Sequence, residues 1–184
     1  MQNIFAPGGL WATPWMERVL PGIVALVEHN PARTVFTRFI TPAVAEERPG
    51  QWRRYFTRWS QATQAEAPPS ALELVAALAR FVPPATVIDK PAYSAFFNSG
   101  LSTFLMRKEV NAVIMTGSET DVCVLSSVLD AVDHGFRVIL VEDGLCSSSD
   151  VGHDALMTLY RTRFTEQIEL LTLDEVRESW RENA

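Results

Sequence analysis

Short runs of apolar residues alternate along the chain with longer segments in which apolar residues recur every three or four positions. Most of the short runs are nearly continuous in apolar side chains, which is typical of strands buried on both faces of a parallel sheet. The predicted strands lie at 34–37, 85–88, 112–115, 137–141 and 167–171.

The longer segments predict helices at 14–28, 71–79, 101–108, 120–134 and 150–164. In the segment 120–134 the apolar positions form one stripe, and Gly135 suits a helix C-cap. Pro21 is expected to bend or split the first helix, because proline removes a backbone hydrogen bond there. This alternation predicts one α/β domain, spanning residues 1–184, with a mainly parallel sheet.

Composition narrows the possible partners. The net charge of −6 and the pI of about 5.1 argue against binding to nucleic acid or to an anionic membrane. No apolar run reaches the length of a membrane span. Two cysteines are too few for a disulfide framework, which favours a reducing, cytoplasmic setting.

Cys123 is the first candidate for chemistry. A predicted strand ends at Met115, a tight turn follows, and Cys123 lies in the first turn of the next helix. Ligands of α/β folds bind at the C-terminal ends of strands, and helix N-termini stabilise anions such as a thiolate. From position alone a buried, structural cysteine is the commoner alternative. Cys146, which follows another strand, is expected to be structural.

Lys90 is the second candidate. It follows the predicted strand 85–88, so it too is expected at the C-terminal edge of the sheet. A solvated surface lysine is the alternative. The neighbouring Tyr93, Phe96 and Phe97 favour a partly enclosed position, where the amine would stabilise a nearby thiolate.

Two segments, "VIDKPAYSAF" and "MTGSETDVCVLSSVLDAVDHGFRVILVEDGLCSSSD", together resemble the isochorismatase-like cysteine hydrolases. This family includes isochorismatases, nicotinamidases and N-carbamoylsarcosine amidases, and the resemblance extends from Met1 to about Leu171. It implies a three-layer α/β/α, Rossmann-like fold and a hydrolase that acts on a small amide or carbonyl compound without a cofactor. It also implies a dimer or tetramer of identical chains.

The resemblance implies a role for several residues. Cys123 would be the nucleophile, Lys90 would support the thiolate, and an aspartate would move the proton. The Ser118–Glu119 peptide would be cis, and the backbone N–H groups of Glu119 and Cys123 would form the oxyanion hole. The expected pocket residues are Phe5, Trp11, Arg38, Tyr93 and Phe96. A surface role for Arg38 and core packing for Trp11 and Trp15 remain alternatives.

The chain departs from the family at "MQNIF". The family's first, central strand ends in Asp-x-Gln, which places the aspartate immediately before Met1. We therefore expect that a central strand is missing or truncated and that Met1 lies beside Cys123 and Lys90. Either the natural protein continues upstream, or this chain is impaired as an enzyme and serves in binding or assembly.

The sequence contains two further segments in which a binding site can be sought. The stretch that binds a metal in some relatives reads "TRFITP" here and lacks histidine, so no metal site is expected, and His29, His134 and His153 are interpreted as solvated. The segment 51–65 mixes tryptophan and arginine, as single-stranded nucleic-acid sites do. Because the chain is acidic, a cap over the pocket or a subunit interface is the better interpretation.

Overall fold

The computed structural model describes residues 1–180, whose five strands form two separate parallel sheets. β1 pairs with β2 in one sheet, and the other has the order β3-β4-β5. The strands are β1 (Val35–Phe39), β2 (Thr86–Lys90), β3 (Ala112–Ser118), β4 (Arg137–Cys146) and β5 (Ile168–Leu171). Each predicted apolar run overlaps one of them, so the predicted α/β class with parallel strands is confirmed.

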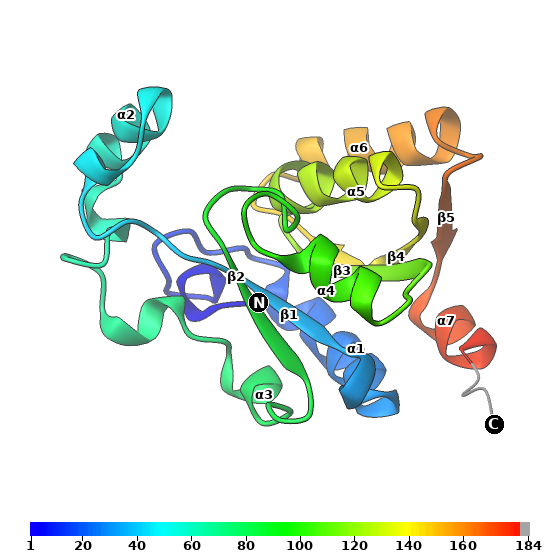
Figure 1. Cartoon of the computed structure of the whole chain (residues 1–184). Coiled ribbons are helices and arrows are strands. Elements are labelled where there is room, and N and C mark those ends of the chain that lie inside the picture. The colour runs from blue at the N-terminus through cyan, green and yellow to red at the C-terminus, as the bar shows by residue number, and fades with distance from the viewer. Residues whose placement is uncertain (181–184) are drawn as a thin grey trace.

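The helices cover both faces of the larger sheet. Figure 1 shows α5 and α6 on one side of β3–β5, and α1 and α7 on the other. The helices are α1 (Met16–His29), α2 (Gly50–Arg58), α3 (Ala76–Ala79), α4 (Leu101–Arg107), α5 (Leu125–Asp133), α6 (Asp150–Arg163) and α7 (Leu173–Ser179). Within residues 1–180, every helix is too short or too polar to cross a bilayer.

The middle strand, β4, explains the continuous apolar pattern. Val138 and Leu140 pack into the cluster formed with α5 and α6, while Ile139 and Val141 pack into the cluster formed with α1 and α7. Successive residues of a strand point to opposite faces, so a strand covered on both faces needs apolar residues at every position.

Several predicted helices differ in detail. α1 is continuous through Pro21, which is exposed, so of the two predicted outcomes the split was wrong, while a bend at this proline stays a prediction. The segment predicted as one helix over 71–79 is a 3-10 turn, Pro69–Leu72, followed by α3. The helix predicted over 120–134 begins with a π-helical turn, Thr120–Val124, before α5. α2 and α7 were not predicted.

The two sheets meet near the N-terminus without a strand between them. No backbone ladder joins β1 to β3 within the described residues, and Asn3–Phe5 forms a 3-10 turn. The buried Gln2 side chain instead caps the edge of β1: its Oε1 accepts from Phe39 N at 2.7 Å and its Nε2 donates to Phe39 O at 3.0 Å. One side-chain amide therefore satisfies two backbone groups of an open strand edge.

Candidate active site

Cys123 lies where β3 turns into helix. Gly117 has a φ of +109°, the Ser118–Glu119 peptide is cis, and the π-helical turn Thr120–Val124 then carries Cys123. A positive φ suits glycine, so the local sequence permits this sharp exit from the strand. The Cys123 side chain is half-buried on the wall of a cavity of about 370 Å³, a volume suited to a small molecule.

The cavity wall is mainly aromatic and comes from segments far apart in the sequence. Trp11 lies at the centre of the aromatic group, with ring centroids of Phe5, Tyr55 and Trp59 at 6.0, 6.0 and 6.1 Å. The wall consists of Phe5, Leu10, Trp11, Ala12, Phe39, Tyr55, Trp59, Tyr93, Glu119, Val122, Cys123 and Ser148.

Lys90, the last residue of β2, is buried beside Cys123. Its Nζ donates to the carbonyl oxygens of Ala92 at 3.0 Å and Tyr93 at 2.6 Å, and lies 5.4 Å from the centre of the Phe39 ring. The amine also faces the Cys123 sulfur closely enough to lower the pKa of that thiol. Lys90 is thus held by the chain that follows it and directed toward the cysteine.

Opposing effects set the protonation of this pair. Burial raises the pKa of the Cys123 thiol above its ordinary value, and Lys90 and the backbone N–H of Glu119 counter only part of that effect. Burial likewise lowers the pKa of Lys90, against the opposing pull of Cys123. Burial thus favours the neutral form of each group, while the amine and the amide N–H are placed to stabilise the thiolate when it forms.

Ser127 joins the two catalytic candidates and was not predicted. Its Oγ donates to the Cys123 carbonyl at 2.7 Å and accepts from the backbone N of Ala95 at 2.9 Å. The same loop carries Ser94, whose Oγ donates to Asp130 on α5. A hydroxyl four residues after Cys123 was the available signal, because serine in a helix commonly bonds to the carbonyl of residue i−4.

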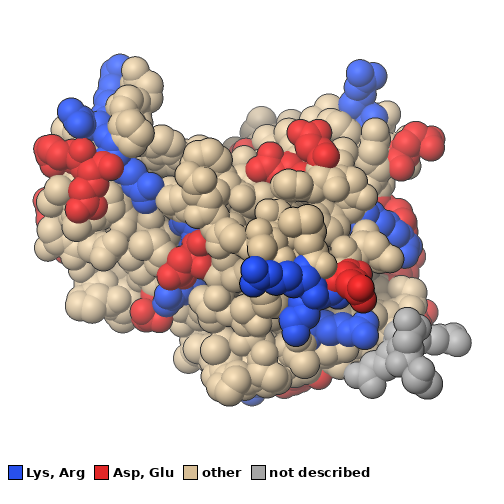
Figure 2. All heavy atoms as spheres, in the orientation of Figure 1, with Lys and Arg blue, Asp and Glu red and all other residues tan. Residues whose placement is uncertain are grey.

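The segment 51–65 covers part of the cavity. Tyr55 and Trp59 contribute to the wall, and Phe56 is buried beneath them. Burial raises the pKa of Tyr55, so its phenol remains protonated at neutral pH. Figure 2 shows Lys and Arg side chains along the protruding α2, at upper left, with Asp and Glu beneath them. The pocket-facing side of α2 is therefore aromatic, whereas its charges face outward.

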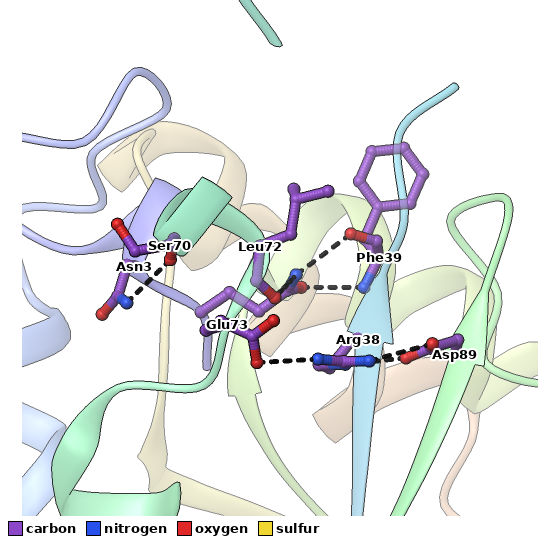
Figure 3. Close-up of polar contacts among 8 residues, drawn as sticks. Asn3, Arg38, Phe39, Ser70, Leu72, Glu73 and Asp89 are labelled. Atoms are coloured by element: carbon purple, nitrogen blue, oxygen red, sulfur yellow. Dashed lines mark hydrogen bonds and ion pairs between the residues drawn. The ribbon is translucent and has the colours of Figure 1, made fainter. Parts of the chain in front are cut away.

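Two expected pocket residues lie elsewhere. The Arg38 guanidinium donates to both carboxylate oxygens of Asp89, at 2.7 and 3.0 Å, and to Glu73 at 2.9 Å (Figure 3). Because these two carboxylates use its donors, Arg38 is not on the cavity wall, and the surface alternative describes it better. Phe96 is buried in the core, packed against Phe136 and His134, because it belongs to the apolar cluster under α5. Phe5, Trp11 and Tyr93 do line the cavity.

Cys146, Met1 and Trp15 are not among the residues that line the described cavity. Cys146 is fully buried, with its pKa raised by burial to about 12. Burial lowers the pKa of the Met1 amine to about 6, and Lys90 and Cys146 act on it to a smaller extent. Trp15 packs against His153, which also contacts the Thr120 hydroxyl at 2.9 Å, so this histidine is not simply solvated.

The described residues contain no group of three or more His, Cys, Asp or Glu side chains arranged to hold a metal ion. His29 is exposed at the end of α1 and contacts the Trp180 carbonyl at 2.8 Å. His134 lies at the end of α5, against the Phe96 ring. The three histidines thus occupy separate places in the fold.

Comparison with protein families matches residues 1–170 to the isochorismatase domain. Maleamate amidohydrolase of Pseudomonas putida is 28% identical over 155 residues, which cover 79% of this chain and 71% of that protein. Ureidoacrylate amidohydrolase of Yersinia enterocolitica is 40% identical over 57 residues, which cover 31% of this chain and 25% of that protein.

Solved structures share the fold. A cysteine hydrolase from Pseudomonas syringae matches with a TM-score of 0.83 and 24% identity, over 97% of this chain and 87% of the other. N-carbamoylsarcosine amidase from Thermoplasma acidophilum matches with a TM-score of 0.74 and 20% identity, over 95% and 92%. At these identities the likeness concerns the arrangement of helices and strands.

Proposed function

Because this chain belongs to the isochorismatase family of hydrolases, we propose that it hydrolyses a small amide with Cys123 as the nucleophile. The observation that carries the proposal is the position of the thiol. It lies on the wall of the aromatic cavity, beside the Lys90 amine and the Glu119 N–H. Those two groups oppose the effect of burial on the thiol pKa, as a nucleophilic cysteine requires.

In the first step the Cys123 sulfur forms a bond to the amide carbonyl carbon, and the C–N bond breaks. The proton released by the thiol ends on the leaving amine. In the second step water attacks the thioester carbon, the C–S bond breaks, and the thiol recovers a proton. The N–H groups of Glu119 and Cys123 would stabilise the carbonyl oxygen while it carries negative charge.

The proton transfer needs an acceptor. The family resemblance implies an aspartate immediately before Met1, outside the printed sequence, and we propose that such a carboxylate would act beside Lys90. The position of this segment supports the proposal, since Gln2 bonds to the backbone of Phe39, which lies opposite Lys90 in the strand register. In the described cavity wall the one carboxylate is that of Glu119.

This last observation favours a second candidate function. Without a carboxylate beside Lys90, the chain would bind a small amide in the cavity and turn it over poorly, as a binding or assembly protein. A chain of this second kind would retain the aromatic cavity, but the reactivity of Cys123 would not depend on Lys90.

The two functions separate in one experiment. The full chain is incubated with maleamate, nicotinamide and ureides while released ammonia is measured, and peptide mass spectrometry then locates any acyl group on Cys123. Treatment with iodoacetamide follows in a parallel sample. Ammonia release with selective, Lys90-dependent labelling of Cys123 supports the hydrolase. Labelling of Cys123 that does not depend on Lys90, with no ammonia from any amide, supports the binding protein.

A further inference from the structure

One carboxylate and no cation are found among the residues that line the described cavity wall. The carboxylate is that of Glu119. Arg38, the cation expected to meet a substrate carboxylate, is paired outside the cavity with Asp89 and Glu73. Lys90 is not among the wall residues, and its Nζ donates to two carbonyl oxygens of its own loop.

The Glu119 carboxylate is fixed in place and acts on the whole cavity. Its Oε1 accepts a hydrogen bond from the backbone N of Ser148 at 3.0 Å. Its negative charge contributes to raising the pKa values of Tyr55, Tyr93 and Cys123. Three separate groups on the wall are therefore close enough to this carboxylate to respond to it electrostatically.

The aromatic wall complements that charge. Tryptophan and tyrosine rings present a negative π face that attracts cations. The Trp11 ring lies among those of Phe5, Tyr55 and Trp59, so the wall presents a continuous aromatic surface to the cavity. Two neighbouring rings already meet cations from other parts of the chain: Lys90 lies 5.4 Å from the Phe39 ring centre and Arg58 5.7 Å from that of Trp59.

We propose that this cavity selects amides whose end opposite the reacting carbonyl carries a positive charge, such as a quaternary or protonated amine. The cation would lie against Trp11 and Tyr55 within the field of Glu119, while the amide faces Cys123. This substrate class rests on the proposed hydrolase function. It differs from an acidic amide such as maleamate, whose carboxylate would meet Glu119 rather than a cation.

A matched set of three amides tests the substrate class. They are 3-(trimethylammonio)propanamide, its neutral carbon isostere 4,4-dimethylpentanamide, and succinamate, which carries a carboxylate. We expect kcat/KM for the cationic amide to exceed that for the isostere by about 10-fold, because an enclosed cation beside aromatic rings gains that order of affinity. Succinamate should be the poorest substrate. Equal rates for the cation and its isostere, or a preference for succinamate, would overturn the proposal.

Binding is measured separately from turnover with the Cys123→Ala variant, by calorimetry. The same order of affinities is expected there even if no amide is hydrolysed, so this assay distinguishes a wrong substrate class from a wrong reaction.

Glu119→Gln should reduce the ratio of cation to isostere affinity several-fold, since it removes the charge and keeps the shape. Glu73→Gln is the matched control, because it removes one carboxylate outside the cavity and should leave that ratio unchanged. An unchanged ratio in Glu119→Gln would contradict the role of this carboxylate.

Discussion

Cys123 and Cys146 both lie where a parallel strand ends, at the same edge of one sheet, yet their surroundings differ. Cys146 is the last residue of β4 and lies opposite Ser118 of β3 in the strand register. Its side chain is fully buried in the apolar cluster formed by α1, and burial raises its pKa to about 12. Cys123, five residues beyond Ser118, reaches the cavity wall, where Lys90 and an amide N–H oppose the effect of burial.

The difference shows that a position at a strand end does not by itself set the surroundings of a cysteine. Both thiols are desolvated, and desolvation favours the neutral form in each. Cys123 additionally has access to a ligand, a neighbouring cation and an amide donor from the turn that precedes it. A nucleophile therefore depends on neighbours contributed by β2 and by the Glu119 turn.

The largest expected effect is the loss of turnover in Cys123→Ala. Removal of the sulfur removes the covalent step, so amide hydrolysis should fall by about 10³-fold or more, measured as ammonia release. Cys146→Ala should retain most of the activity, because its sulfur lies outside the cavity. Equal losses in the two variants would remove the distinction between these cysteines.

Lys90→Met tests the neighbouring charge. Loss of this ammonium leaves burial less opposed, so the pKa of Cys123 should rise further above its ordinary value. The rate of alkylation by iodoacetamide increases as pH rises through the thiol pKa, so the midpoint of this profile should move to higher pH. At neutral pH the labelling should slow by roughly 10-fold.

Lys108 is the chain's other lysine and lies exposed after α4, so Lys108→Met is the matched control. Its profile should coincide with that of the unaltered protein. If Lys90→Met also leaves the midpoint where it was, Lys90 does not stabilise the thiolate.

Ser127→Ala tests whether Cys123 needs its link to the Lys90 loop. The variant loses the bond to the Cys123 carbonyl and leaves the backbone N of Ala95 unpaired, so the two segments should shift relative to each other. We expect kcat to fall on the order of 10-fold, since small displacements of reacting groups are costly, with a shifted alkylation midpoint. Ser126→Ala is the control. A change in thermal stability without any change in the pH profile would assign Ser127 a structural role only.

The smallest effect concerns stability. Cys146→Ala removes a fully buried sulfur from the α1 cluster and should lower the free energy of unfolding by about 1 kcal/mol. Cys123→Ala, at a half-buried position on a cavity, should change it less. Urea unfolding followed by circular dichroism measures both changes. A larger loss of stability in Cys123→Ala than in Cys146→Ala would contradict the structural role of Cys146.

The local sequence was sufficient where one segment contains its own signal. The strand β4 is recognisable because its apolar residues are continuous, which is typical of a strand covered by helices on both faces. The helix α7 also has a local signal, although this helix was not predicted. Thr172 and Glu175 form a capping box, whose spacing is visible in the sequence. The short helix α2 had none, since its position depends on Phe56 packing under the aromatic wall.

The sequence by itself determined the α/β class, the order of the strands along the chain and the presence of Cys123 and Lys90 at strand ends, because these follow from local patterns of polarity. The tertiary structure alone decided which residues surround the thiol. Arg38 pairs with Asp89 and Glu73 outside the cavity, and Tyr55 of α2 lies on the cavity wall. Such choices depend on distances between segments far apart in the chain, which no local pattern contains.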